Sequence, residues 1–241
     1  MTDPAVTTTE ASLADLSNRI AELETKSWNI PPKLLPDLQP TLTSTALSQM
    51  SRARSAVIKS NCTSAVWKFV PSDYYSYDLE KRRQTLGATT TFQLCKSMLM
   101  ENVKCDNADC SDRTNSRYYL VVVQYEAEIN GKKLASEIRA LRAAGKDRLP
   151  PNKFEFRLAS SEDNDRLTGY VTNSVTPFGL LDDKVPIVLA SAAKDVKPAF
   201  VFMGGGHMDL KLGMAVEDFV KGTNAIVADV SDARSGAFSE E

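Results

Sequence analysis

Histidine is almost absent from this chain of 241 residues, which contains only His207. A single histidine excludes most Ser-His-Asp and Cys-His schemes, unless His207 itself is the base. No apolar run approaches the roughly 20 residues that a membrane-spanning helix needs. Residues 1–9 lack the basic and apolar regions of a secretory signal and the arginines of a transit peptide. These absences lead us to expect a cytoplasmic protein that does not contact a membrane.

Cysteine is also scarce, and the four cysteines do not form a metal-binding pattern. Cys105 and Cys110 lie near three aspartates, but no second closely spaced pair accompanies them. Structural zinc sites usually need four Cys or His ligands at characteristic spacings. Together with Cys62 and Cys95, these side chains are expected to be reduced thiols in the cytosol. We predict no metal and no cofactor.

Neither sign of charge dominates, because 29 Lys and Arg are set against 31 Asp and Glu, for a net charge of −2. A protein that binds nucleic acid indiscriminately is usually strongly basic. Contact with a single RNA end depends on a local patch, and basic residues do cluster at 52–59, 81–83 and 132–148. These clusters are either solvated helix faces or an RNA contact.

The pattern of residues 1–60 predicts a helical N-terminal extension. Apolar residues at spacings of three and four predict a helix over 10–26. Such a short helix is unstable alone in water, so it must pack on this domain, on a second copy or on another protein. Prolines predict an extended linker over about 30–41. A second helix is expected over 43–60.

Residues 64–230 combine short strands and short helices without a regular strand–helix–strand repeat, which predicts a mixed sheet of the α+β class. The expected helices cover residues 78–86, 132–144, 161–167 and 216–222. The expected strands cover residues 65–70, 118–129, 153–158, 186–190, 199–203, 208–214 and 225–230. A flexible C-terminal tail is expected over 231–241.

The most informative segment is 169–180, which places loop-forming residues between two apolar runs. Pro177 removes a backbone donor and restricts the residue before it to extended angles. Gly169 and Gly179 permit backbone angles that other residues avoid. We therefore expect a rigid loop whose backbone groups face a cleft.

Segments 91–100, 116–123, 169–180 and 202–213 resemble, in this order, motifs of the YbaK/prolyl-tRNA-synthetase-associated family, whose members are aminoacyl-tRNA editing domains. The resemblance runs over about 64–230 and is closest to the longer eukaryotic members. It implies a curved, barrel-like mixed sheet with flanking helices. It also implies a deacylase that works in trans and removes alanine or cysteine from a mischarged tRNA for proline.

The same resemblance suggests site residues. Lys96, which from the sequence alone either snorkels to the surface or points into a cleft, takes the position of an essential lysine. Its ammonium would lie near phosphate or a developing oxyanion. Asn173 stands where members commonly have glycine, and asparagine tolerates positive φ. Ser174 and Thr176 either bind the substrate or only close the turn. The expected substrate-binding residues are Gly169, Asn173, Ser174, Val175, Thr176, Pro177, Gly204, Gly205, Gly206 and His207.

Residues 204–206 are three glycines that either admit a ligand close to the backbone or form a tight turn. No Gly-Lys-Ser/Thr follows them, which excludes a nucleotide phosphate loop. His207 is a candidate general base. Arg113 and Asn115 are candidate tRNA contacts, where Arg113 would clamp a phosphate; alternatively, Asp112 pairs within the insert.

Two rival functions remain open. One is a non-catalytic subunit of a multi-synthetase complex that binds aminoacyl-tRNA or a synthetase, as Asn173 and the helical extension suggest. The other is a hydrolase of small aminoacyl esters that needs no RNA. In each tRNA-dependent case the partner is the 3′ acceptor end, and the helix over 10–26 is our candidate for docking a synthetase or forming a homodimer.

Overall fold

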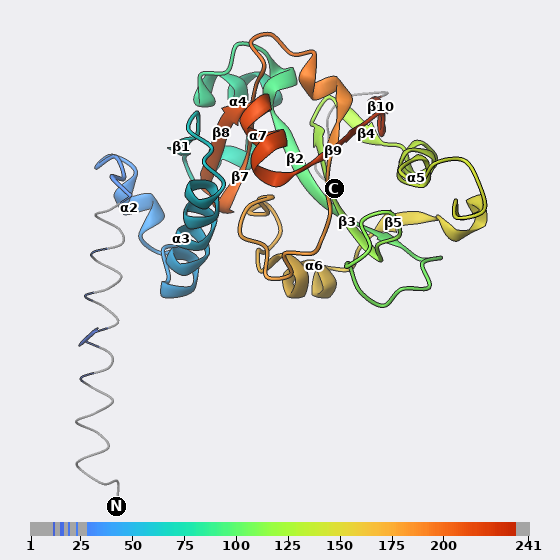
Figure 1. Cartoon of the computed structure of the whole chain (residues 1–241). Helices are drawn as coiled ribbons and strands as arrows, with labels where there is room; N and C mark the ends of the chain where they lie inside the picture. The colour runs from blue at the N-terminus through green and yellow to red at the C-terminus, as the bar shows by residue number, and fades with distance from the viewer. Residues whose placement is uncertain (1–11, 13–14, 17–18, 20–22, 24–27, 235–241) are drawn as a thin grey trace, which may run out of the picture.

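The structure, a computed structural model, describes residues 28–234 together with residues 12, 15, 16, 19 and 23 (Figure 1). The helix expected over 10–26 lies mostly outside these residues. The helices are α2 (Leu35–Leu38), α3 (Ser44–Lys59), α4 (Leu79–Leu86), α5 (Gly131–Ala140), α6 (Ser161–Thr168) and α7 (Val216–Thr223). The strands are β1 (Val66–Phe69), β2 (Cys95–Asn102), β3 (Tyr118–Gln124), β4 (Ala127–Ile129), β5 (Phe156–Leu158), β6 (Ile187–Ala190), β7 (Phe200–His207), β8 (Leu210–Ala215), β9 (Ile226–Ala228) and β10 (Ser231–Ala233).

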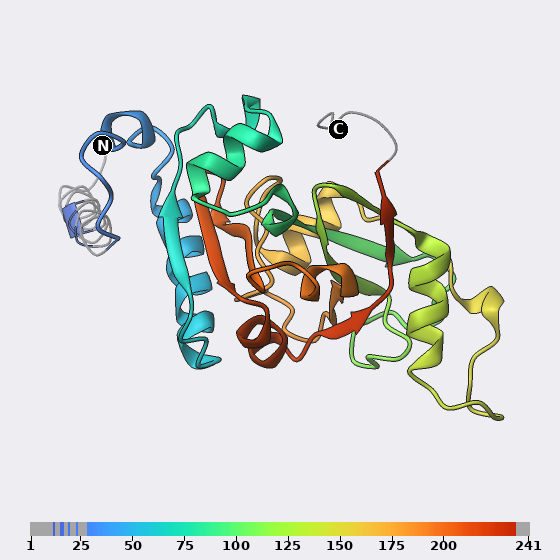
Figure 2. The same ribbon diagram turned by 90° about the horizontal axis from the view of Figure 1, so that it is seen from above.

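The main core lies between a five-stranded sheet, β5-β2-β3-β6-β9, and a three-stranded sheet, β1-β8-β7. Figure 2 shows the three-stranded sheet on one side of the larger sheet and α5 on the other. On β3, Leu120 and Val122 belong to the core that includes β7, β8, α3 and α7. Tyr119 and Val121 belong to the core under α5. Burial on both faces explains the continuous apolar run of this strand.

The mixed sheet confirms the α+β class. In the larger sheet β2 is antiparallel to β3 and β5, whereas β6 is parallel to β3 and β9. β4 and β10 form a separate antiparallel pair. A parallel bridge between Leu94 and Phe202 joins the two larger sheets at one point. Within residues 28–234 the three sheets do not close, so the barrel-like detail of the prediction is not confirmed.

The proline-rich segment 30–41 is not the extended linker that we predicted. It forms turns and the short helix α2, in which Leu38 is completely buried. Just before it, the Trp28 ring packs edge-on against Trp67, with 5.4 Å between the ring centroids. Burial of these apolar side chains holds the segment on the domain, and this outweighs the extended preference of its prolines.

Local capping signals set the ends of two predicted helices. At the start of α3, the Thr43 hydroxyl accepts from the Ala46 N–H at 3.1 Å. At the start of α4, the Asp78 carboxylate accepts from the Lys81 N–H at 2.7 Å. Gly87 ends α4 with a φ of 69°. Side-chain acceptors at the N-cap and a left-handed residue at the C-terminus are the usual helix boundaries.

α5 ends at Ala140, earlier than the predicted boundary at residue 144. Beyond it, Arg142 Nη2 donates to Asp112 Oδ2 at 2.7 Å. Arg142 Nε donates to Thr114 Oγ1 at 2.8 Å. These bonds tie the chain after α5 to the insert around residue 112, so the residues that would extend the helix form turns instead.

Three strand boundaries also differ from the prediction. A turn at residues 125–126 divides the strand expected over 118–129 into β3 and β4. β7 continues to His207 through the three glycines, which therefore lie in an irregular strand and not in a tight turn. Ser231–Ala233 pair with β4 where we expected a tail.

Every helix in the described part of the chain is too short or too polar to cross a bilayer.

Glu101 on β2 is buried between two arginines. Arg117 Nη2 donates to its carboxylate at 2.6 Å, and Arg157 Nε does so at 2.9 Å. Burial by itself raises the pKa of Glu101, but the hydrogen bonds from Arg157 and Arg117 outweigh burial and hold the pKa below the usual 4.5. When the pKa of a carboxyl group is lower in the folded state than in the unfolded state, its charge stabilises the fold. This contribution is complete above the unfolded-state pKa of 4.5 and disappears as the pH falls through the folded-state pKa.

We therefore expect Glu101→Gln to lower the free energy of unfolding at neutral pH, and we expect the difference from the wild type to shrink in acid. Denaturant unfolding at several pH values measures this. Glu155→Gln is the control, because Glu155 is exposed and its ion pair with Lys104 is long, at 3.6 Å. Such a surface pair contributes little to stability. A difference for Glu101→Gln that does not change with pH would contradict the assignment.

Candidate active site

A cavity of about 270 Å³ opens between β2 and the loop that follows α6. Four of the predicted site residues line it: Lys96, Asn173, Val175 and Gly204. The remaining walls come from β2 and β5, the first turn of α6, the end of β10 and two tyrosines. The cavity therefore joins segments that are far apart in the sequence.

The loop after α6 owes its shape to residues with left-handed backbone angles. Gly169 ends α6 with a φ of 71°. Asn173 has a φ of 66°, so asparagine adopts here an angle that glycine would supply in other members. The Ser174 hydroxyl donates to the Val171 carbonyl at 2.7 Å, and the Ser174 N–H donates to the same oxygen at 3.0 Å. Ser174 thus closes the turn.

The glycines of β7 let this strand press against the loop backbone. A Cβ atom at Gly204 would lie 2.3 Å from the Val175 carbonyl oxygen, far inside contact distance. The Gly206 N–H donates to the Ser174 carbonyl at 3.0 Å. One wall of the cavity is therefore loop backbone that is packed against, and hydrogen-bonded to, the backbone of β7. Such a wall is stiffer than one made of long side chains.

Two cationic side chains line the cavity. They are Lys96 and Arg234, and none of the described lining residues is Asp, Glu or His. Arg234 also pairs with Glu128, at 3.6 Å. Burial raises the pKa of the Cys95 thiol to about 12, so Cys95 is not a thiolate nucleophile at neutral pH. Burial, followed by the proximity of Tyr125 and Tyr74, raises the pKa of Tyr75 well above 10. Within the described part of the chain, the lining can therefore stabilise negative charge but contains none of the Asp, Glu or His side chains that commonly act as general bases.

Comparison with known proteins gives the family. The family profile described as "Aminoacyl-tRNA editing domain" matches residues 77–221. The chain belongs to the aminoacyl-tRNA editing domain family. Comparison with curated proteins gave no match.

Solved structures show the same fold as this editing domain. A candidate trans-editing enzyme for prolyl tRNA synthetase has 18% identity and a TM-score of 0.58, over 77% of this chain and 98% of that chain. The protein APE2540 has 18% identity and a TM-score of 0.55, over 75% and 99%. A protein from work on epitope grafting onto scaffold proteins has 17% identity and a TM-score of 0.58, over 77% and 98%. At such identities the likeness concerns the fold alone.

Twelve of the sixteen lining residues of the editing-domain cavity were not predicted, among them Tyr75, Tyr125 and Arg234. The Tyr75 hydroxyl donates to the Asn173 carbonyl at 2.7 Å and accepts from Lys211 Nζ at 2.7 Å. Tyr75 thereby supports the loop at its left-handed residue. The tyrosine-rich stretch before α4 is a signal that could have indicated an aromatic wall. Tyr125 and Arg234 have no comparable local signal, because β-sheet pairing carries them to the cavity.

His207 does not line the cavity. Its Nε2 lies 3.4 Å from the Thr41 carbonyl oxygen, and its Nδ1 accepts from the Asp209 N–H at 3.1 Å. Burial lowers the pKa of His207, while the nearby Asp209 carboxyl opposes that shift. The only histidine is thus buried against Thr41, in the segment before α3, and it is not among the residues that line the cavity.

The two candidate tRNA contacts lie in the insert, apart from the cavity. Arg113 Nη2 donates to the Asn224 carbonyl at 2.7 Å. The buried Asn115 carbonyl accepts from Asn107 Nδ2 at 2.8 Å and from the Cys105 thiol at 3.3 Å. Both residues therefore have internal partners. The other predicted residues that the cavity does not reach are Gly169, Ser174, Thr176, Pro177, Gly205 and Gly206.

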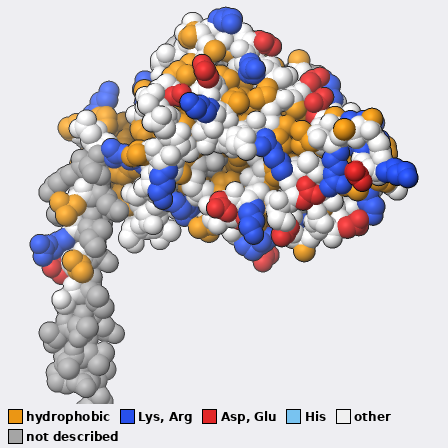
Figure 3. Space-filling view, in the orientation of Figure 1, with side chains coloured by type: hydrophobic (Ala, Val, Ile, Leu, Met, Phe, Trp, Pro, Cys, Tyr) orange, Lys and Arg blue, Asp and Glu red, His pale blue; other side chains and the backbone are white. Residues whose placement is uncertain are grey.

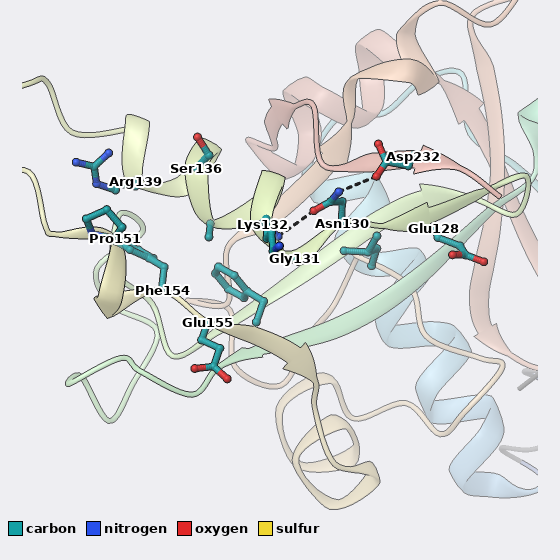
Figure 4. A pocket seen from close by; sticks show the side chains of 13 residues that line it. Glu128, Asn130, Gly131, Lys132, Ser136, Arg139, Pro151, Phe154, Glu155 and Asp232 are labelled. Atoms are coloured by element: carbon teal, nitrogen blue, oxygen red, sulfur yellow. Dashed lines mark hydrogen bonds between the residues drawn. The ribbon is translucent and has the colours of Figure 1, made fainter. Parts of the chain in front are cut away.

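A larger cavity of about 770 Å³ lies at the start of α5, beside β4 and β5 (Figure 4). Asn130 lies between Asp232 and the first turn of α5: its Nδ2 donates to Asp232, and its Oδ1 accepts from the Lys132 N–H. Acidic and basic side chains both line this cavity, and none of the predicted site residues does. Its composition therefore gives no preference for an anionic ligand.

Proposed function

We propose that this editing domain is an aminoacyl-tRNA deacylase that acts in trans. The supporting observation is the cavity of about 270 Å³ that Lys96 shares with the stiff loop backbone at Asn173 and Val175. The residues known to line it include two cations and no carboxylate, which complements the polyanionic 3′ end of a tRNA. On the face shown in Figure 3, Lys and Arg are interspersed with Asp and Glu, so RNA contact would depend on residues at the cavity.

The chemistry requires little from side chains. Water adds to the ester carbonyl, the bond to the ribose breaks, and the amino acid leaves while the terminal adenosine regains its hydroxyl. The carbonyl oxygen becomes negative in between, and the Lys96 ammonium would stabilise that charge. Because none of the described residues that line the cavity is Asp, Glu or His, the proton of the attacking water would pass to a group of the substrate. The neighbouring ribose hydroxyl is the candidate that the family implies: it would accept this proton while it passes its own proton to the ribose oxygen that leaves.

The acyl group would be selected by size. A cavity of about 270 Å³ suits a small side chain on the terminal adenosine better than a large one. A difference of one methylene in an apolar pocket is worth only about 1–3 kcal/mol, so contacts with the tRNA body must add selectivity. We propose alanine or cysteine on the tRNA for proline as the substrate.

A deacylation panel tests this function. The purified protein is incubated with the tRNA for proline that carries alanine, cysteine or proline. The tRNA for alanine that carries alanine, and alanyl-adenosine without a tRNA body, complete the panel. We expect the fastest hydrolysis with alanine or cysteine on the tRNA for proline, and the prolyl ester to react at least about 10-fold more slowly.

Each rival function predicts a different result in the same panel. Equal rates with alanyl-adenosine would indicate an esterase that needs no RNA. If the protein hydrolyses none of the esters, the deacylase function is refuted. If such an inactive protein still binds tRNA or a synthetase, the result indicates a scaffold. Leu16 and Leu23 of the N-terminal segment are exposed, which fits docking to a synthetase or to a second copy. Co-purification of synthetases from the same preparations tests that contact.

A further inference from the structure

Helix α3 carries an arginine that bridges the two ends of the cavity loop. Arg52 Nε donates to the Gly179 carbonyl at 2.6 Å. Its Nη2 donates to the Gly169 carbonyl at 2.8 Å. These two carbonyls are ten residues apart in the sequence, and one planar guanidinium holds both. In Figure 1, α3 lies beside the loop that follows α6.

Further contacts make this bridge specific. The guanidinium of Arg52 lies over the Tyr170 ring, with 4.5 Å from its carbon to the ring centroid. The Tyr170 hydroxyl is buried and donates to the Phe178 carbonyl at 2.8 Å. Gln49 Nε2, one turn earlier on α3, also donates to the Gly169 carbonyl, at 2.8 Å. The base of the loop is therefore fixed from α3, while the middle of the loop lines the cavity.

Only glycine fits at the point where the guanidinium arrives. A Cβ atom at Gly169 would lie 2.6 Å from Arg52 Nη2, and the φ of 71° disfavours any residue with a side chain. The helix that provides this arginine precedes residues 77–221, the segment that the family profile matches. The site of this chain is thus completed by a part of the sequence outside that segment.

We propose that Arg52 is a positioning residue for the proposed deacylation. It touches no substrate, but it holds the backbone of the loop in the position in which the loop and Lys96 line the same cavity. The proposal rests on the function proposed above. A lysine cannot replace the arginine, because an ammonium is a point donor and does not span two carbonyls in one plane. A displacement of about 1 Å in a positioned group can cost about 10²-fold in rate.

The test compares Arg52→Lys with Arg54→Lys. Arg54 lies on the same helix and its guanidinium also covers an aromatic ring, Trp28, at 5.0 Å, but it does not line the cavity. We measure kcat and KM for deacylation, and hydrogen exchange of the amides at 170–179. We expect Arg52→Lys to lower kcat by about 10²-fold with little change in KM, and to accelerate exchange in the loop. Arg54→Lys should match the wild type in both.

The exchange measurement separates failure of this inference from failure of the proposed function. If the wild type hydrolyses no ester, the proposed function fails. The comparison of amide exchange at 170–179 between Arg52→Lys and the wild type still decides whether Arg52 holds the loop, and faster exchange in the variant would show that it does. If Arg52→Lys equals Arg54→Lys in kcat and in exchange, the inference is overturned. Gln49→Ala removes only one donor to the Gly169 carbonyl, so it should give an intermediate effect in both measurements, and it serves if Arg52→Lys does not fold. Wild-type values for Gln49→Ala would then overturn the inference.

Discussion

Lys96→Ala is expected to lower kcat for deacylation by about 10²- to 10³-fold, because it removes the cation proposed to stabilise the developing oxyanion. Lys96 lies on β2, whose pairing with β3 places it opposite Val123, so the change leaves backbone hydrogen bonds intact. KM should change less than kcat, since the charge develops fully only during the reaction. Steady-state kinetics with alanine on the tRNA for proline measures both quantities.

Lys104→Ala is the matched control. Lys104 lies just beyond the end of β2, is more than half exposed, and is not among the lining residues of the cavity. Its removal should leave kcat within about twofold of the wild type, as expected for a surface pair of little energetic weight. Lys96→Arg keeps the charge in a planar group and should restore only part of the rate. Full activity in Lys96→Ala would remove the role that we assign to this residue.

The sequence was sufficient for elements whose signals are local. Asp78 and Gly87 mark both ends of α4, and these residues act on backbone groups within one helical turn. The same holds for α6, which Ser160 caps by accepting from the Asp163 N–H at 3.1 Å. Where a residue satisfies its own neighbours, chain position alone is informative.

Elements that depend on distant partners could not be predicted in this way. Prolines at 31–40 favour extended backbone locally, but Leu38 is buried and Trp28 packs on Trp67, and neither contact has a sequence signature. The strand Ser231–Ala233 exists because β4 pairs with it. A polar, short segment next to the chain end otherwise has the composition of a tail.

The candidate site divides along the same line. Lys96 and Asn173 were expected from the resemblance of their segments to motifs of the editing family, and the structure brings both to one cavity. Arg52 and Arg234 reach the loop and the cavity only through the packing of α3 and the pairing of β10. A method that reads one stretch at a time identifies the wall and the charge of such a site, but not the residues that hold the wall in position.

Gly204→Ala is expected to damage both stability and activity. The added methyl carbon would lie 2.3 Å from the Val175 carbonyl oxygen, and the obstacle is backbone that cannot change rotamer. The loop must therefore move away from β7, at a cost of about 1–3 kcal/mol in the free energy of unfolding. Because Val175 lines the cavity, its displacement should also lower kcat by about 10²-fold. Denaturant unfolding and deacylation kinetics measure the two effects.

Gly131→Ala provides the control, since it also brings a methyl carbon toward a carbonyl oxygen. There the distance to the Phe156 oxygen is 3.4 Å, an ordinary contact, and the residue begins α5. Alanine is up to about 1 kcal/mol more favourable than glycine in a helix, so this variant should be at least as stable as the wild type and fully active. If Gly204→Ala behaved like Gly131→Ala, the loop would be free to retreat from β7 without consequence, and a stiff main-chain wall could not be what positions the ester.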